Sequence, residues 1–176
     1  VYTAGIYVFN SSPIIRTNQR ISSGNAEDGS HGSWGIFVRG NSLPVISNNR
    51  EITTNNVANI TGGSGGIYYR DSGLGGTISG NSVLVTAPAG NAYGIRLVNL
   101  DGANPINIYN NAILVEVPSG RGAYLSGSNT SGTPRVFLNH NTIIANDAST
   151  TGLAIYSEGL QFQPAIRRNS ILGSSL

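Results

Sequence analysis

The sequence contains no cysteine, no methionine and no lysine among its 176 residues. The lack of cysteine excludes both a disulfide framework and a metal site built on thiolates. The lack of cysteine and methionine together suits a protein in an exposed, oxidising location. We therefore expect an extracellular or cell-surface protein.

Charge is also scarce, because charged residues make up only 10% of the chain and the formal net charge is +2. Nucleic-acid binding needs a clustered basic stripe, so we expect no nucleic-acid partner. No apolar run approaches the ~18 residues of a membrane span, and no signal peptide is visible. Because the chain begins with Val, we expect a processed or excised piece.

An internal repeat is the main positive feature of the sequence. Glycines that precede a short apolar run recur every 28 to 31 residues, at Gly5, Gly35, Gly66, Gly94, Gly122 and Gly152. A second marker, an asparagine three positions after an aliphatic residue, keeps the same step at Asn18, Asn49, Asn81, Asn111, Asn141 and Asn169. Two independent markers in step predict six coils, which start near residues 5, 35, 66, 94, 122 and 152.

Within each unit the apolar residues alternate with a period of two, as in IYVF, IFVR and IYYR after the first three glycines. Further short apolar runs follow on either side of the asparagine, separated by Gly, Asn, Ser and Pro. No stretch shows sustained helical periodicity. The pattern predicts an all-β chain with three short strands per coil.

Units of this kind cannot bury an apolar face alone, but stacked units can. With strands ~4.8 Å apart, equivalent residues of successive units form ladders. We expect one buried aliphatic ladder at Ile6, Ile36, Ile67, Ile95, Ala123 and Leu153. We expect a second ladder of asparagines at a bend, where the side-chain amides satisfy backbone groups of the tight corner.

The pattern G-I-Y-V-x-N-S-S-P-x-I-x-x-N-x-x-I resembles the right-handed parallel β-helix repeat of the pectin-lyase-like superfamily, over roughly residues 4 to 173. The resemblance implies a right-handed parallel β-helix that forms a single domain over residues 1–176, without evident caps. The superfamily includes pectate lyases, polygalacturonases, alginate epimerases, tailspikes and adhesins. The regular units of this chain resemble the superfamily's repetitive surface proteins more than its enzymes.

Aromatic and arginine residues recur on the outward side of the first strand of each coil. One outward column is Tyr7, Phe37, Tyr68, Arg96 and Tyr124, and we expect a second beside it at Phe9, Arg39, Arg70, Val98, Ser126 and Tyr156. Three explanations stay open. The rings stack because aromatics favour strands, the face contacts another protein, or it binds a glycan through rings and arginines. Its ligand or partner residues would be Tyr7, Phe37, Arg39, Tyr68, Arg70, Arg96 and Tyr124.

Acidic residues are too sparse for the chemistry that this fold supports in enzymes. Asp71 and Asp101 fall at turns after the first strands of adjacent coils. A lyase would need a calcium cluster with a basic residue, and a hydrolase two or three converging carboxylates. We expect both aspartates to be solvated turn residues, and the chain to have no catalytic site.

The loop over residues 22–34 holds the densest group of titratable residues, Glu27, Asp28 and His31, followed by Trp34. Their spacing does not fit a metal site, so we expect a loop whose Trp34 covers the edge of the coil. His140, one residue before a ladder asparagine, is expected to be a bend residue. The sequence therefore predicts no metal and no cofactor.

No amphipathic helix or charged edge strand covers either predicted end of the stack, whose last coil runs to Ile171 and Leu172. Uncovered solenoid ends expose backbone groups and core. We therefore expect a structural protein whose partner is itself, through coil-on-coil stacking and lateral contacts. The alternatives are a polysaccharide-binding or polysaccharide-processing domain, or an adhesin against a host surface protein, both using the Tyr/Arg face.

Overall fold

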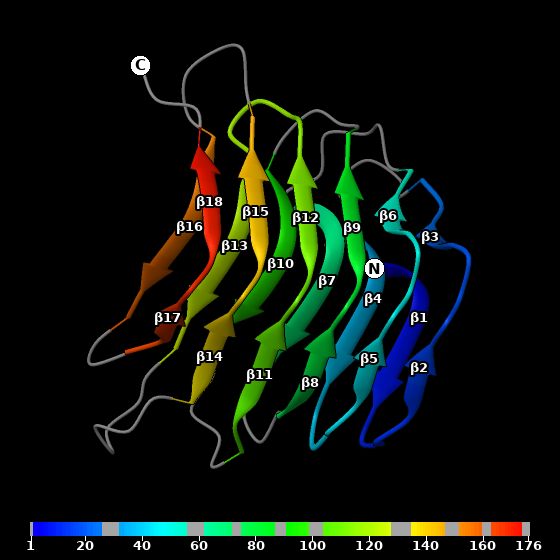
Figure 1. Ribbon diagram of the computed structural model, residues 1–176. Helices are drawn as coiled ribbons and strands as arrows, with labels where there is room; N and C mark the ends of the chain where they lie inside the picture. The colour runs from blue at the N-terminus through cyan, green and yellow to red at the C-terminus, as the bar shows by residue number, and fades with distance from the viewer. Residues whose placement is uncertain are drawn as a thin grey trace.

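A computed structural model describes residues 2–25, 32–55, 62–71, 75–86, 91–98, 104–127, 135–146, 152–159 and 163–173. The described residues form a parallel β-solenoid of three six-stranded sheets. Figure 1 shows the coils stacked side by side, with the first coil (blue) and the last coil (red) at opposite ends. The prediction of an all-β solenoid with six coils and three short strands per coil is confirmed.

Each coil contributes one strand to each sheet. Sheet A contains β1 (Tyr2–Phe9), β4 (Gly32–Arg39), β7 (Ser64–Arg70), β10 (Ala92–Val98), β13 (Arg121–Ser126) and β16 (Leu153–Glu158). Sheet B contains β2 (Ile14–Arg16), β5 (Val45–Ser47), β8 (Gly76–Ser79), β11 (Ile106–Tyr109), β14 (Val136–Asn139) and β17 (Ala165–Arg167). Sheet C contains β3 (Ile21–Ser23), β6 (Ile52–Thr54), β9 (Ser82–Val85), β12 (Ala112–Val115), β15 (Thr142–Ala145) and β18 (Ser170–Gly173).

The core is a set of aliphatic ladders, because parallel in-register pairing places equivalent residues of successive coils above one another. In sheet A one ladder runs through Ile6, Ile36, Ile67, Ile95, Ala123 and Ile155. Sheet C adds Ile21, Ile52, Val83, Ile113, Ile143 and Ile171. The ladder residues of the four inner coils and Ile21 pack into one continuous interior cluster, Ile6 and Ile155 are partly buried against it, and Ile171 is 49% exposed.

The repeated glycine is needed because the ladder of sheet C packs directly against it. A Cβ atom on Gly66 would lie 2.3 Å from Val83 Cγ1, and one on Gly94 would lie 2.3 Å from Ile113 Cγ2. No real side chain tolerates such distances. The glycine marker in the sequence is therefore the point where sheets A and C meet most closely.

The asparagine ladder forms as predicted at the corner between sheets B and C. Each Nδ2 donates to the Oδ1 of the asparagine in the next coil, at 2.8 to 3.0 Å. From the second coil onward the same Nδ2 also donates to a backbone carbonyl of the preceding coil, as Asn81 does to Ile46 at 2.9 Å. The corner therefore leaves few backbone groups unpaired although it is buried.

The register of the sixth coil differs from the prediction by two residues. Leu153 pairs with Arg121, and Ile155 rather than Leu153 continues the ladder beyond Ala123. The residue opposite Gly122 is therefore Ala154, a small residue that also leaves room for sheet C, and not Gly152. A slip of two residues preserves the alternation of inward and outward side chains, so the apolar pattern alone could not detect it.

Within the described ranges no helix is long and apolar enough to cross a membrane. The right-handed sense of the coil stays a prediction, in line with the strong preference of parallel crossovers for that hand.

Candidate functional site

The predicted outward column of sheet A is present. Pairing places Tyr7, Phe37, Tyr68, Arg96, Tyr124 and Tyr156 above one another. Ring centroids lie 5.4 Å apart for Tyr7 and Phe37, and 5.0 Å apart for Phe37 and Tyr68. Tyr156 was expected in the neighbouring column, which is wrong because of the two-residue slip; Glu158 occupies that place, opposite Ser126.

A third column, from the residue before the glycine, thickens this aromatic layer. It contains Trp34 and Tyr93 with Gly65 between them. The Trp34 ring fills the space above Gly65, 4.4 Å from the Tyr68 ring and 6.0 Å from the Tyr93 ring between centroids. Trp34 was expected in a loop that covers the edge of the coil, but it lies within β4 and is fully buried in the aromatic layer. Glu27, Asp28 and His31, which precede it, lie outside the described residues.

Three arginines contact the aromatic layer through their guanidinium groups, and one of them, Arg70, lies 5.8 Å from the centroid of the Tyr2 ring. Arg96 lies over the rings of Tyr93, Tyr68 and Tyr124, at 4.7, 5.1 and 5.5 Å from their centroids. Its Nη1 also donates to the carbonyl of Gly62 at 2.6 Å. Arg121 lies 4.5 Å from the centroid of Tyr156. These cation–π contacts hold successive coils together.

Arg121 was not among the predicted face residues. Its signal in the sequence was its place before Gly122, which matches the places of Trp34 and Tyr93 before their glycines.

Most rings of the predicted face are closed to solvent. Phe37, Tyr68 and Tyr124 are 2%, 3% and 8% exposed, whereas Tyr7 is 54% exposed. Mutual stacking favours the structural explanation for the central rings. Among the rings of the predicted face, that of Tyr7 in the first coil is therefore the one most open to a ligand.

The first coil carries an open hollow on this face. Its volume is about 300 Å³, and it is lined by Tyr2, Ala4, Tyr7, Phe37 and Arg39. Beside it the rings of Tyr7 and Phe9 lie 6.2 Å apart and nearly parallel. The hollow therefore combines open aromatic surface with one guanidinium group.

An ion-pair group borders the hollow in the second column. Arg39 Nε donates to Asp71 Oδ2 at 2.8 Å, and this bond raises the pKa of Arg39. Arg70 Nε lies 3.8 Å from Asp71 Oδ1, and Arg70 also donates to the Tyr2 hydroxyl. Asp71 lies in the turn as expected, but its carboxylate pairs with arginines of two coils. Asp101 lies outside the described residues.

At the other end of the face, Glu158 accepts hydrogen bonds from two tyrosines. The Tyr124 hydroxyl donates to one carboxylate oxygen, and the Tyr156 hydroxyl donates to the other at 2.9 Å. The first bond is the larger cause of the lowered pKa of Glu158. Burial, followed by the bond to Glu158, raises the pKa of Tyr124 to about 12. Neither phenol is a ready proton donor near neutral pH.

Within the described part of the chain, no three residues of the His, Cys, Asp and Glu types gather as metal ligands. His140 is a bend residue, as expected, with a positive φ of 56°.

Searches among protein-family models, curated proteins and solved structures find no match for this chain.

Proposed function

We propose that the chain is a non-catalytic structural β-solenoid of the cell surface or extracellular space, which assembles by stacking its last coil on the first coil of a second copy. The observation that carries the proposal is the exposure of core positions in the last coil. Ile166 and Ile171 are 40% and 49% exposed, whereas their first-coil counterparts Ile15 and Ile21 are 7% and 5% exposed. Covering these isoleucines would gain about 25 cal/mol for each Å² removed from water.

The asparagine ladder gives this contact a register. Asn169 Nδ2 donates to the carbonyls of Leu138 and Arg167, but it has no asparagine of a following coil to bind. At the other end Asn18 Nδ2 donates to Asn49, while Asn18 Oδ1 accepts no ladder bond within the described ranges. Inner members such as Asn111 keep a bond to a carbonyl of their own corner beside the ladder bond, so Asn169 could in the same way donate to Asn18 Oδ1 of a second copy.

The edge strands support the same contact. β1, β2 and β3 form one edge of the three sheets, and β16, β17 and β18 form the other. Exposed strand edges are templates for further pairing. A head-to-tail contact of this kind does not close on itself, so it produces a filament. Six coils at ~4.8 Å give an axial repeat of about 29 Å.

Sheet C offers a surface for the proposed lateral contacts. An outward apolar column runs through Leu84, Leu114, Ile144 and Leu172. A shallow hollow of about 370 Å³ lies along its first three members, flanked by Ser82, Ala112 and Thr142. Filaments could associate side by side along this stripe.

The test is negative-stain electron microscopy with light scattering over a range of protein concentrations. We expect filaments with an axial repeat near 29 Å, and we expect Ile171→Glu to abolish them because it charges the end face. The control Ser170→Glu adds the same charge to the neighbouring exposed position on the outside of β18, and it should still form filaments. Monomers of the unmodified chain at every concentration would overturn the proposal.

A second candidate function rests on the hollow at Tyr2, Tyr7, Phe37 and Arg39, where the open ring of Tyr7 and the guanidinium group of Arg39, which also binds Asp71, suit an acidic glycan. An adhesin would use the same surface against a host surface protein. We further propose that the chain belongs to the pectin-lyase-like superfamily, among its repetitive surface proteins, and the parallel solenoid of three sheets supports this. Tyr7→Ala should weaken binding to uronate or sulfated glycans, and failure of the unmodified chain to bind any of them removes this candidate.

A further inference from the structure

A groove of about 460 Å³ lies at the corner between sheets B and C, far along the chain from the Tyr/Arg face of the first coil. Its lining comes from three successive coils and consists of Tyr109, Asn110, Asn139, His140, Arg167 and Arg168. The first member of each pair ends β11, β14 or β17, and the second is the next residue. The groove is therefore built by two short columns of side chains on adjacent coils.

The backbone of this corner is held firmly. The ladder asparagines that follow each pair donate through Nδ2 to the carbonyls of Tyr109, Asn139 and Arg167, at 3.1, 3.2 and 3.0 Å. The N–H groups of Asn110 and His140 donate to carbonyls of the next coil. Because the backbone groups are engaged, the six side chains are the parts that can bind a ligand.

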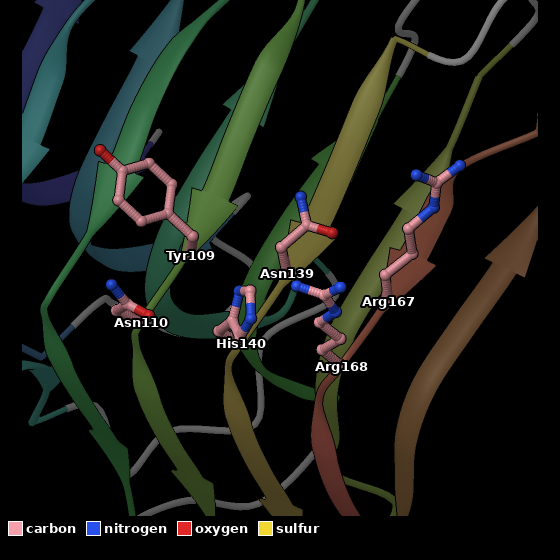
Figure 2. A pocket seen from close by; sticks show the side chains of 6 residues that line it. All are labelled: Tyr109, Asn110, Asn139, His140, Arg167 and Arg168. Carbon is pink, nitrogen blue, oxygen red and sulfur yellow. The ribbon is translucent and has the colours of Figure 1, made fainter.

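The side chains that line the groove include cationic groups but no anionic one. It offers two guanidinium groups, an imidazole, two carboxamides and a phenol ring, and no carboxylate. Among the ion pairs of the described residues, none involves Arg167 or Arg168, and both side chains are exposed. Figure 2 shows the Arg168 guanidinium beside the His140 ring and Asn139, with Tyr109 and Arg167 on the two flanks. Such a lining favours an anion.

The backbone of Arg168 adopts a conformation that is unfavourable for an arginine. It has a positive φ of 53°, in the left-handed region where glycine and asparagine are most at ease. The same place in earlier coils is occupied by Asn48, Gly80 and Asn110, which suit that conformation, and in two coils by Thr17 and His140. An arginine here costs stability, and residues kept in such conformations concentrate at binding sites.

We propose that this corner groove binds an acidic saccharide. Arg167 and Arg168 hold its carboxylate or sulfate group, Asn110 and Asn139 bond its hydroxyls, and the exposed ring of Tyr109 packs against a sugar face. Tyr109 and Arg167 are two coils apart, ~10 Å, so the ligand contacts both flanks only if it is longer than one sugar. The site is separate from the hollow on sheet A, but Arg167 and Arg168 lie in the last coil, so a stacked second copy would place its first coil beside them.

The experiment is isothermal titration calorimetry of the full chain with three probes: a tetragalacturonate, a heparin tetrasaccharide and neutral maltotetraose. At least one acidic tetrasaccharide should bind, the neutral one should not, and comparison of the two acidic probes identifies the preferred anion. Arg168→Asn should weaken binding at least tenfold, since a charge-assisted hydrogen bond is lost. The same variant should unfold at a higher temperature, which excludes misfolding as the cause.

Arg50→Gln is the matched control, because it removes one exposed arginine from a different part of the surface. This variant should bind the acidic probe as the unmodified chain does. The proposal is overturned by no binding of either acidic probe, by unchanged binding in Arg168→Asn, or by an equal loss in Arg50→Gln. It is also overturned if inorganic sulfate binds as tightly as the saccharide, since the sugar contacts would then contribute nothing.

Discussion

At the scale of single residues, the corner between sheets B and C requires a backbone conformation that most residue types disfavour. One residue per coil has a left-handed backbone there, with φ between 52° and 64°: Thr17, Asn48, Gly80, Asn110, His140 and Arg168. Asparagine and glycine adopt this region easily, whereas a β-branched residue is an outlier in it. Thr17 is therefore the member of this column with the poorest local fit.

We expect Thr17→Asn to stabilise the protein by about 1 kcal/mol, because asparagine tolerates the left-handed conformation. For a chain of this size that raises the unfolding midpoint by about 2–4 °C. The bond from the Thr17 hydroxyl to the Arg16 carbonyl is exposed, so its loss matters little. Thermal unfolding followed by circular dichroism measures the change. The reverse exchange, Asn48→Thr, should lower the midpoint, and a rise there would contradict the argument.

Tyr69 is a second residue with an unfavourable local environment, because its polar hydroxyl lies in the apolar core. Its side chain occupies the interior ladder of sheet A between Val38 and Leu97 and is fully buried. Among the described residues, its hydroxyl has no hydrogen-bond partner. Burial raises the pKa of this phenol far above its usual range. A buried, unpaired hydroxyl is destabilising.

Tyr69→Phe should therefore stabilise the protein by about 1 kcal/mol, because it removes the unpaired group and keeps the ring. Urea unfolding measures the difference. Tyr109→Phe removes an exposed hydroxyl and should change stability by less than about 0.5 kcal/mol. If Tyr69→Phe proved as destabilising as the loss of a satisfied hydrogen bond, the hydroxyl would have to be bonded in solution.

At the scale of elements, the asparagine ladder joins the corners of successive coils through hydrogen bonds to backbone groups and to neighbouring asparagines. Asn111 illustrates this, because its Oδ1 accepts from both the backbone N–H and the Nδ2 of Asn81, at 2.9 and 3.0 Å. Its own Nδ2 donates to the carbonyl of Ile78 at 2.9 Å and to Asn141 at 2.9 Å. Removing one member leaves buried donors and acceptors in two neighbouring coils.

We predict that Asn111→Ala lowers the free energy of unfolding by about 3 kcal/mol, because unpaired buried groups carry their full desolvation penalty. Urea denaturation provides the measurement. Asn107→Ala, on the partly exposed outer side of β11, removes a chemically identical side chain and should change stability by less than about 0.5 kcal/mol. Similar losses for the two variants would mean that the ladder adds no more than an ordinary surface asparagine.

The elements that the sequence predicted well are those with two independent markers. Glycine before an apolar run and asparagine at the corner gave the coils, the three sheets and the ladders of the first five units. The sixth unit went wrong because the alternation of Leu153 and Ile155 is equally good in both registers. The burial of Phe37 and Tyr68 could not be predicted, since it depends on how rings from three columns cover one another. The corner groove was missed because its residues lie in two columns that differ in every coil.

At the scale of the whole molecule, stability is distributed along the stack, since each coil contacts only its neighbours. The inner coils are covered on both sides, and their ladder residues are fully buried. The two ends are not equivalent, because the first coil keeps Val8, Ile15 and Ile21 buried while the last coil leaves Ile166 and Ile171 partly open. Local opening therefore begins from the last coil.

Hydrogen exchange followed by mass spectrometry tests this order. In dilute solution we expect β16, β17 and β18 to exchange first, then β1 to β3, and the strands of the second to fourth coils last, because local opening is easiest where few contacts must break. At concentrations that support filaments, stacking covers both ends, so the end strands should become protected while the inner strands stay unchanged. Equal exchange in all coils would mean that the stack opens only as one unit. If protection of the end strands did not change with protein concentration, the stacking hypothesis would be contradicted. The unequal stability of the two ends would still stand.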